Sequence, residues 1–314
     1  MTKSKIVFTA IIAALLTLIL ALVVVAAVEY HKDIDEFSLN DTIPDGSGKE
    51  ATVILLAGQS NASGCSYDDY LKRNVSPEKY DEYEMGYDNV YINYFVSGTN
   101  ESNGFVKCSV RQGENGVCFG PELGLAEKLN EVYPDETFFI IKYTWGGTNL
   151  FEQWLSPSSY GKTGTLYKNF VKYVETSIKY LESKNYNVKI EGMCWMQGES
   201  DSFSEENGNN YDVHLSNFIK DIRRKFAYCA AEDGIEFIDA YIADNPIFWV
   251  YCDLVNQSKK KVADSSPMNT VIDTSDLITT EEPEDNPDIP HYDSLSELEL
   301  GHRFAEALAV FLID

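Results

Sequence analysis

The sequence predicts an α/β fold in which a mostly parallel five-stranded sheet carries helices on both faces. Short apolar or β-branched runs alternate along the chain with longer segments of helical period. Alternating strands and helices of this length are typical of βαβ units, which place a parallel sheet between two layers of helices. The 314 residues suffice for one large α/β domain or two small ones.

The strands are predicted from short runs bounded by polar or turn-forming residues, and the helices from apolar residues that recur on one face. In the first predicted helix Leu125, Ala126 and Leu129 share a face, and Pro121 occupies the first turn, where no backbone N–H is needed. The predicted strands are 52–56, 137–143, 189–196, 236–242 and 269–272, and the predicted helices are 121–132, 167–183, 211–231 and 294–313.

An uncharged run of 23 residues, 6–28, precedes the domain. A bilayer needs roughly 20 apolar residues, so residues 1–28 are predicted to form a transmembrane helix that serves as a signal anchor. Lys3 and Lys5 before the run predict a single pass at the cell membrane, with the carboxyl-terminal domain outside. Val25-Ala26-Ala27 also fits a cleavage site, and cleavage of a signal peptide would make the protein secreted. Residues 29–49 are polar and predicted to be a tether, and 50–314 form the domain.

Charge and cysteine usage restrict the partners. Without the leader, the chain carries 23 basic and 50 acidic side chains, a net charge of −27. Such a charge argues against binding to nucleic acid. The six cysteines allow fifteen full pairings. The single disulfide favoured is Cys108 with Cys118, because the two flank a short Gly-rich stretch. The four histidines are not clustered with carboxylates, so neither a metal nor another cofactor is predicted.

Ser60 lies just after the first predicted strand, in Ala57-Gly58-Gln59-Ser60-Asn61. A serine at the carboxyl edge of a sheet stands where open α/β folds bind ligands, and it is a candidate nucleophile if a base is supplied elsewhere. Gln59 and Asn61 are expected to fix the loop. The segment 63–119 that follows is unusually long and tyrosine-rich, and it is read as an insertion whose tyrosines stack on sugars or pack on the domain.

Later strand ends supply the remaining groups of a serine hydrolase. Gly146 and Gly147 follow the second strand and allow close approach of the backbone to a ligand. Gln197 follows the third strand, where its amide is a candidate donor to an oxyanion. Asp288 and His291 stand three residues apart before the last helix, and a carboxylate at this spacing can orient an imidazole to accept a serine proton.

These motifs resemble those of the SGNH-hydrolase superfamily, in particular the carbohydrate esterase family 6 and sialate O-acetylesterase-like group, which includes acetylxylan esterase-like members. The shared patterns are GQSN at 58–61, the glycine pair, QGExD at 197–201 and DxxH at 288–291. The resemblance runs from about residue 52 to 312 and implies a three-layer α/β/α sandwich of flavodoxin-like type. It departs from the wider superfamily, which has Asn in place of Gln197 and Asp in place of Gln59.

The resemblance implies a serine esterase that removes O-acetyl groups from carbohydrate, such as xylan or sialic acid, through an acetyl-serine intermediate. Ser60 would be the nucleophile, His291 the general base and then acid, and Asp288 the residue that orients it. The implied oxyanion hole combines the Ser60 N–H with a glycine N–H and an amide: Gly146 or Gly147, and Gln197.

Two alternatives remain open from the sequence. Glu199 and Asp201 are a carboxylate pair of the kind that glycosidases use, although a supporting role in the loops is preferred. A non-catalytic cell-surface module that binds carbohydrate is the second alternative. Trp154, shortly after the glycine pair, is expected either to contact sugar or to lie in the core.

Overall fold

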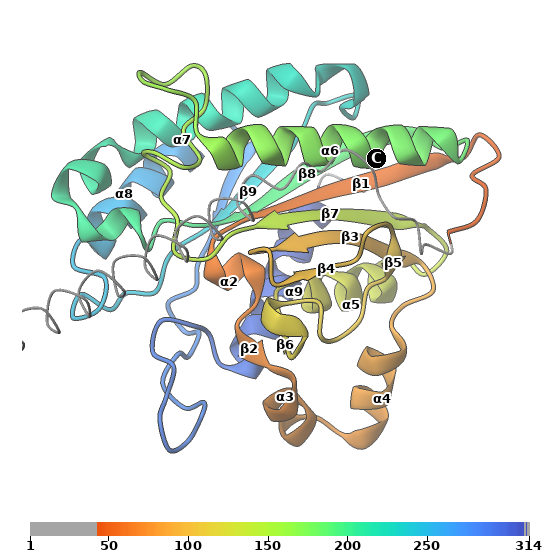
Figure 1. The fold of residues 1–314 in the computed structure, drawn as a ribbon, viewed down its shortest axis with the longest axis horizontal. Coiled ribbons are helices and arrows are strands. Elements are labelled where there is room, and N and C mark those ends of the chain that lie inside the picture. The colour runs from red at the N-terminus through yellow and green to blue at the C-terminus, as the bar shows by residue number, and fades with distance from the viewer. Residues whose placement is uncertain (1–42, 311, 313–314) are drawn as a thin grey trace, which may run out of the picture. The chain divides into compact units, whose positions relative to one another are not determined.

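The computed structural model describes residues 43–310 and 312, and a mixed sheet of eight strands lies at its centre (Figure 1). The strand order is β10-β9-β8-β1-β7-β3-β4, and β5 also pairs with β3. Every pairing from β10 to β3 is parallel, whereas β4 and β5 are short and antiparallel. The strands are β1 (Glu50–Gly58), β3 (Val90–Val96), β4 (Asn100–Glu101), β5 (Val106–Lys107), β7 (Phe138–Thr144), β8 (Asn187–Met196), β9 (Glu236–Ala240) and β10 (Asn269–Ile272).

Helices cover both faces of the sheet, which gives three layers (Figure 1). One face is covered by α6 (Thr165–Ser183), α7 (Glu205–Lys225) and α8 (Cys252–Ala263), and the other by α5 (Glu122–Val132) and α9 (Ser294–Ala309). The backbones of α5 and α9 are in contact. A Cβ on Gly124 would lie 1.9 Å from the Leu298 carbonyl oxygen, and a Cβ on Gly301 would lie 2.1 Å from that of Pro121. These two glycines therefore set the packing of α5 on α9.

The segment 63–119 is largely folded, and this corrects the predicted size of the sheet. It contains β3, which extends the parallel part of the sheet and was missed because VYINYFV carries an asparagine and two tyrosines and lies among acidic residues. The sheet is thus larger than the five strands predicted. Tyr80, Tyr83 and Tyr87 are buried, so they pack within the domain. α2 (Ser60–Ser63) precedes the segment, whose remaining elements are β2 (Ser66–Tyr67), α3 (Asp68–Asn74), α4 (Pro77–Met85), the 3-10 turn η1 (Glu114–Gly116) and β6 (Cys118–Phe119).

The predicted leader and most of the predicted tether lie outside the described residues. In the described residues, no helix combines the length and the apolar character that a membrane crossing requires. The end of the tether lies against the domain, because Ile43 is buried and the Gly46 N–H donates to the Lys184 carbonyl oxygen at 2.7 Å. The predicted Cys108–Cys118 disulfide is not formed: all six cysteines are free thiols, and Cys108 Sγ donates to the Glu122 carbonyl oxygen at 3.4 Å.

Candidate active site

Ser60 stands on the carboxyl edge of the sheet, between the ends of two neighbouring strands. Gly58 at the end of β1 pairs with Thr144 of β7 on one side and with Met196 of β8 on the other. The φ of Gly58 is +145°, and a Cβ there would lie 1.9 Å from the Met196 carbonyl oxygen. Only glycine fits this turn, which ends the strand and leaves Ser60 as the half-buried first residue of α2.

Asn61 ties the turn of Ser60 to the segment that carries His291. Its Nδ2 donates to the Pro290 carbonyl oxygen at 3.3 Å, and its Oδ1 accepts from the Tyr292 N–H at 3.3 Å. The two residues on either side of His291 are therefore held by the residue next to Ser60. This contact brings together two predicted site segments that are more than two hundred residues apart in the sequence.

Asp288 and His291 form a hydrogen bond in the loop before α9. The distance from His291 Nδ1 to Asp288 Oδ2 is 2.8 Å, and both side chains are partly exposed. The Asp293 carboxylate steadies the base of the loop by accepting from the N–H groups of Glu281 at 2.9 Å and Glu282 at 3.1 Å. A bond at Nδ1 fixes the tautomer whose Nε2 can accept a proton.

The glycine turn after β7 lies beside Ser60. A Cβ on Gly146 would lie 3.6 Å from Ser60 Cβ, so the two backbones run close together. The Gly146 N–H donates to Ser97 Oγ at 3.0 Å. Gly147 is exposed, has a φ of +66°, and its N–H, like that of Ser60, has no hydrogen-bond partner among residues 43–310. Ser97, at the end of the β3 that the sequence did not reveal, is a residue of the site that was missed.

The amide of Gln197, predicted to donate to an oxyanion, is hydrogen-bonded within the protein. Its side chain is fully buried, and its Nε2 donates to Asp201 Oδ2 at 2.7 Å and to the Thr148 carbonyl oxygen at 2.9 Å. A third acceptor, Gln59 Oε1, lies 3.2 Å away. The N–H groups of this amide are thus directed to protein oxygens, so the geometry gives Gln197 the role of a link beneath the site.

Glu199 and Asp201 are also buried below the surface of the site, and this counts against the glycosidase alternative. Glu199 Oε1 accepts from Asn61 Nδ2 at 2.7 Å, and burial raises the pKa of the Glu199 carboxyl. Asp201 accepts from the Leu150 N–H at 2.9 Å, and burial raises its pKa to about 6. Neither side chain is more than 1 % exposed. Carboxylates enclosed in this way cannot flank a glycosidic bond.

Two lysines beneath the site are committed to buried ion pairs. Lys142 Nζ donates to Glu122 Oε2 at 2.6 Å, and Lys259 Nζ donates to Asp239 Oδ1 at 2.5 Å. Both lysines are almost completely buried. They stabilise strand ends and neighbouring turns and are not available to bind a ligand anion.

Comparison with known proteins identifies the family. Residues 50–310 match the family model described as carbohydrate esterase, sialic acid-specific acetylesterase. The chain belongs to this family. The prediction of a carbohydrate O-acetylesterase of the sialate O-acetylesterase-like group is thereby confirmed, and the alternative of a non-catalytic module loses its support. No curated protein matches the chain.

Three solved structures share the fold of this chain. NanS superposes with a TM-score of 0.63 at 16% identity, over 87% of this chain and 99% of its own. A protein from Arabidopsis thaliana gives 0.59 at 18% identity, over 83% and 98%. A carbohydrate acetylesterase from Xanthomonas citri gives 0.56 at 16% identity, over 83% of this chain and 56% of its own. At these identities the likeness extends to the fold.

Of the two roles expected for Trp154, the structure shows the core role. Trp154 is fully buried, and its Nε1 donates to Thr148 Oγ1 at 2.9 Å, so it cannot contact a sugar. Phe151 is exposed on the segment that follows β7, and Phe203 is exposed on the segment that follows β8. No pattern in the sequence around Phe151 or Phe203 indicated that their rings would be exposed.

Proposed function

We propose that this carbohydrate esterase hydrolyses O-acetyl esters of sugars through an acetyl-Ser60 intermediate, with His291 as general base and acid and Asp288 as its orienting carboxylate. The hydrogen bond between His291 Nδ1 and Asp288 Oδ2 carries the proposal. It leaves Nε2 to accept the Ser60 proton, and Asn61 holds the residues on both sides of His291 next to the Ser60 turn.

In the first step Ser60 Oγ attacks the acetyl carbonyl carbon while its proton passes to His291 Nε2. The tetrahedral intermediate collapses when the bond to the sugar oxygen breaks, and His291 returns the proton to that oxygen. A water molecule then attacks the acetyl-enzyme with His291 again as base, which releases acetate and restores Ser60. Ser60 Oγ has no hydrogen-bond partner among residues 43–310. We therefore propose that its hydrogen bond to His291 Nε2 forms during the reaction.

The oxyanion would lie against N–H groups at the sheet edge. The Ser60 N–H opens a helix and has no partner within it, and the Gly147 N–H is likewise open. Gly146 contributes by its close approach to Ser60, since its own N–H is bonded to Ser97. An oxyanion hole of main-chain groups fits a site whose Gln197 amide is buried.

Gln59, Asn61, Glu199 and Asp201 would support this site from below. Gln59 Oε1 accepts from the Ser200 N–H at 3.2 Å, and Asp201 binds the turn that follows the glycine pair. Together with Asn61 and Glu199 they join the ends of β1, β7 and β8. We propose further that 50–314 is the esterase domain and that the leader exports it, either as an anchor or as a cleaved signal peptide.

Trapping of the intermediate tests the mechanism. After a rapid acid quench of enzyme turning over 4-nitrophenyl acetate, intact-mass measurement should show the mass of one added acetyl group. Peptide mapping should place the group on Ser60. An acetyl group on another residue, with none on Ser60 during turnover, would contradict the proposed nucleophile.

A further inference from the structure

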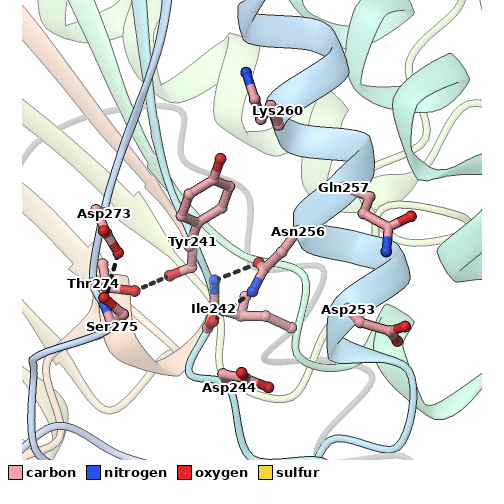
Figure 2. Close-up of a pocket in the computed structure, with 10 residues that line it drawn as sticks. All are labelled: Tyr241, Ile242, Asp244, Asp253, Asn256, Gln257, Lys260, Asp273, Thr274 and Ser275. Carbon is pink, nitrogen blue, oxygen red and sulfur yellow. Dashed lines mark hydrogen bonds between the residues drawn. The ribbon is translucent and has the colours of Figure 1, made fainter.

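A second recess lies on the same sheet edge as Ser60. It is a cavity of about 350 Å³ at the carboxyl ends of β9 and β10, bordered by α8. Figure 2 shows the ring of Tyr241 between the 273–275 segment and this helix. Because open α/β sheets bind ligands at the carboxyl ends of their strands, the position itself suits a ligand.

The cavity is connected to the Ser60 site through two of its walls. Ile242 lines it and packs toward the loop after β8, where a Cβ on Gly198 would lie 3.3 Å from Ile242 Cγ2. The same loop is bonded to Gln59, next to Ser60, through the Ser200 N–H. On the other side, the 273–275 segment precedes the 276–290 stretch, which ends at His291. Two walls of the cavity are therefore built from segments that also lead to the Ser60 site, and β8 lies between the strand ends of the two.

The lining offers polar groups that no other residue uses. The Asp253 carboxylate, the Gln257 amide and the Tyr241 hydroxyl have no hydrogen-bond partner among the described residues, and Asp253 and Gln257 are exposed on α8. Asn256, in contrast, is fixed by two bonds of 2.9 Å to the backbone of Ile242. An aromatic ring beside open donors and acceptors, held on fixed walls, can bind the apolar face and the hydroxyl groups of a sugar ring.

The charge of the cavity selects against anions. Asp244, Asp253 and Asp273 line it, and the one lysine of the lining, Lys260, is paired with Asp264 at 2.8 Å outside it. The described part of the chain contains no group of three His, Cys, Asp or Glu side chains arranged to hold a metal ion. A ligand carboxylate placed here would meet three like charges without a compensating cation.

We propose that this cavity is a subsite for an uncharged sugar residue of the same oligosaccharide chain as the acetylated one, so that the enzyme prefers acetylated neutral oligosaccharides to acetylated sialic acid. The inference rests on the proposed function, because it takes the acetyl ester to lie at Ser60. It specifies that the substrate is an oligosaccharide and that the sugar bound in the cavity is uncharged.

Variants in the cavity test the subsite. Gln257→Ala and Asp253→Ala, both exposed, should each raise KM for acetylated xylo-oligosaccharides by about tenfold through lost hydrogen bonds. Neither should change kcat/KM on 4-nitrophenyl acetate, which is too small to reach the cavity. Asp135→Ala, an exposed change in the turn before β7 at the opposite sheet edge, is the matched control and should leave both substrates unaffected. An unchanged KM for the oligosaccharides in both cavity variants would overturn the subsite.

Reversal of charge tests the selectivity. The wild-type enzyme should have a higher kcat/KM on acetylated xylo-oligosaccharides than on 9-O-acetylated sialic acid, and Asp253→Lys should shift the ratio several-fold toward sialic acid. The shift should shrink in high salt. An enzyme that prefers the sialic acid, with a ratio unaffected by Asp253→Lys, would overturn the inference. Ser60→Ala separates the two proposals: activity that survives this change contradicts the mechanism, whereas altered KM values in the cavity variants concern the subsite alone.

Discussion

Asn61 Nδ2 donates a buried hydrogen bond of 2.7 Å to Glu199 Oε1, and this bond joins the turn of the nucleophile to the loop after β8. The same amide group holds the residues on either side of His291. A single side chain thus positions the three segments that the proposed mechanism needs. Its contribution is positional, since Asn61 is almost completely buried.

Asn61→Ala should therefore lower both activity and stability. Loss of the bond leaves Glu199 without its partner, which should cost about 1–3 kcal/mol in the free energy of unfolding. It should also lower kcat on 4-nitrophenyl acetate by about tenfold or more, because His291 loses its alignment. Urea unfolding and steady-state kinetics measure the two effects. Asn209→Ala, an exposed change on α7, is the control, and an Asn61→Ala enzyme with wild-type values would refute the positioning role.

Asp288→Asn should impair catalysis with little effect on folding. The amide keeps the size of the side chain but favours the wrong tautomer of His291, an effect worth about 10⁴-fold in kcat in serine proteases. Because Asp288 is partly exposed, the melting temperature should stay within a few degrees of wild type. A loss of less than about tenfold in kcat would show that the Asp288–His291 bond is not used in the reaction.

Gln197→Ala distinguishes a structural role from an oxyanion-hole role. The buried amide links Asp201, Thr148 and Gln59, so its removal should lower the free energy of unfolding by about 1–3 kcal/mol. An oxyanion donor would instead lower kcat by about 100-fold or more without loss of stability. Denaturant unfolding with parallel kinetics separates the two results, and a stable but inactive variant would restore the role predicted from the sequence.

Glu297 should make stability depend on pH. It is fully buried in the first turn of α9, neither carboxylate oxygen has a hydrogen-bond partner among the described residues, and burial raises its pKa well above the usual value. The folded state therefore holds this proton more tightly than the unfolded state. The contribution to stability is complete below about pH 4.5 and is lost as the pH rises above that value, with a slope of up to about 1.4 kcal/mol per pH unit.

Glu297→Gln should flatten this dependence. The free energy of unfolding, measured by urea denaturation between pH 5 and pH 9, should fall less steeply with pH in the variant than in the wild-type protein. The two slopes should differ by up to about 1.4 kcal/mol per pH unit. Glu306→Gln, an exposed change on the same helix, should leave the wild-type slope unchanged. Identical slopes in wild type and Glu297→Gln would mean that Glu297 does not titrate differently on folding.

The sequence predicted the parts of the fold whose pattern is local. The apolar run of β7 and the amphipathic period of α6 are visible without knowledge of their neighbours, and so is the three-residue spacing of Asp288 and His291. β3 was missed because its buried polar residue, Asn93, is satisfied by partners distant in sequence, such as Ser177 Oγ at 3.0 Å.

Burial of individual side chains was the part that the sequence could not supply. Gln197 and Trp154 stand next to motif positions, yet both are turned into the domain by bonds to Thr148. Ser97 and Phe203 gave no pattern at all. The side of a strand-end turn that is exposed to solvent depends on how the turn packs against its neighbours. Those neighbours follow other strands and are distant in the sequence.

The central claim is that Ser60 is the nucleophile, and acetate release by Ser60→Ala tests it most directly. Purified wild-type, Ser60→Ala and Ser63→Ala proteins should be compared on acetylated xylo-oligosaccharides and on 4-nitrophenyl acetate, with circular dichroism to establish that each is folded. Ser60→Ala should lose at least about 1,000-fold in kcat, whereas Ser63→Ala should remain active. A folded Ser60→Ala protein that releases acetate at the wild-type rate would contradict the claim.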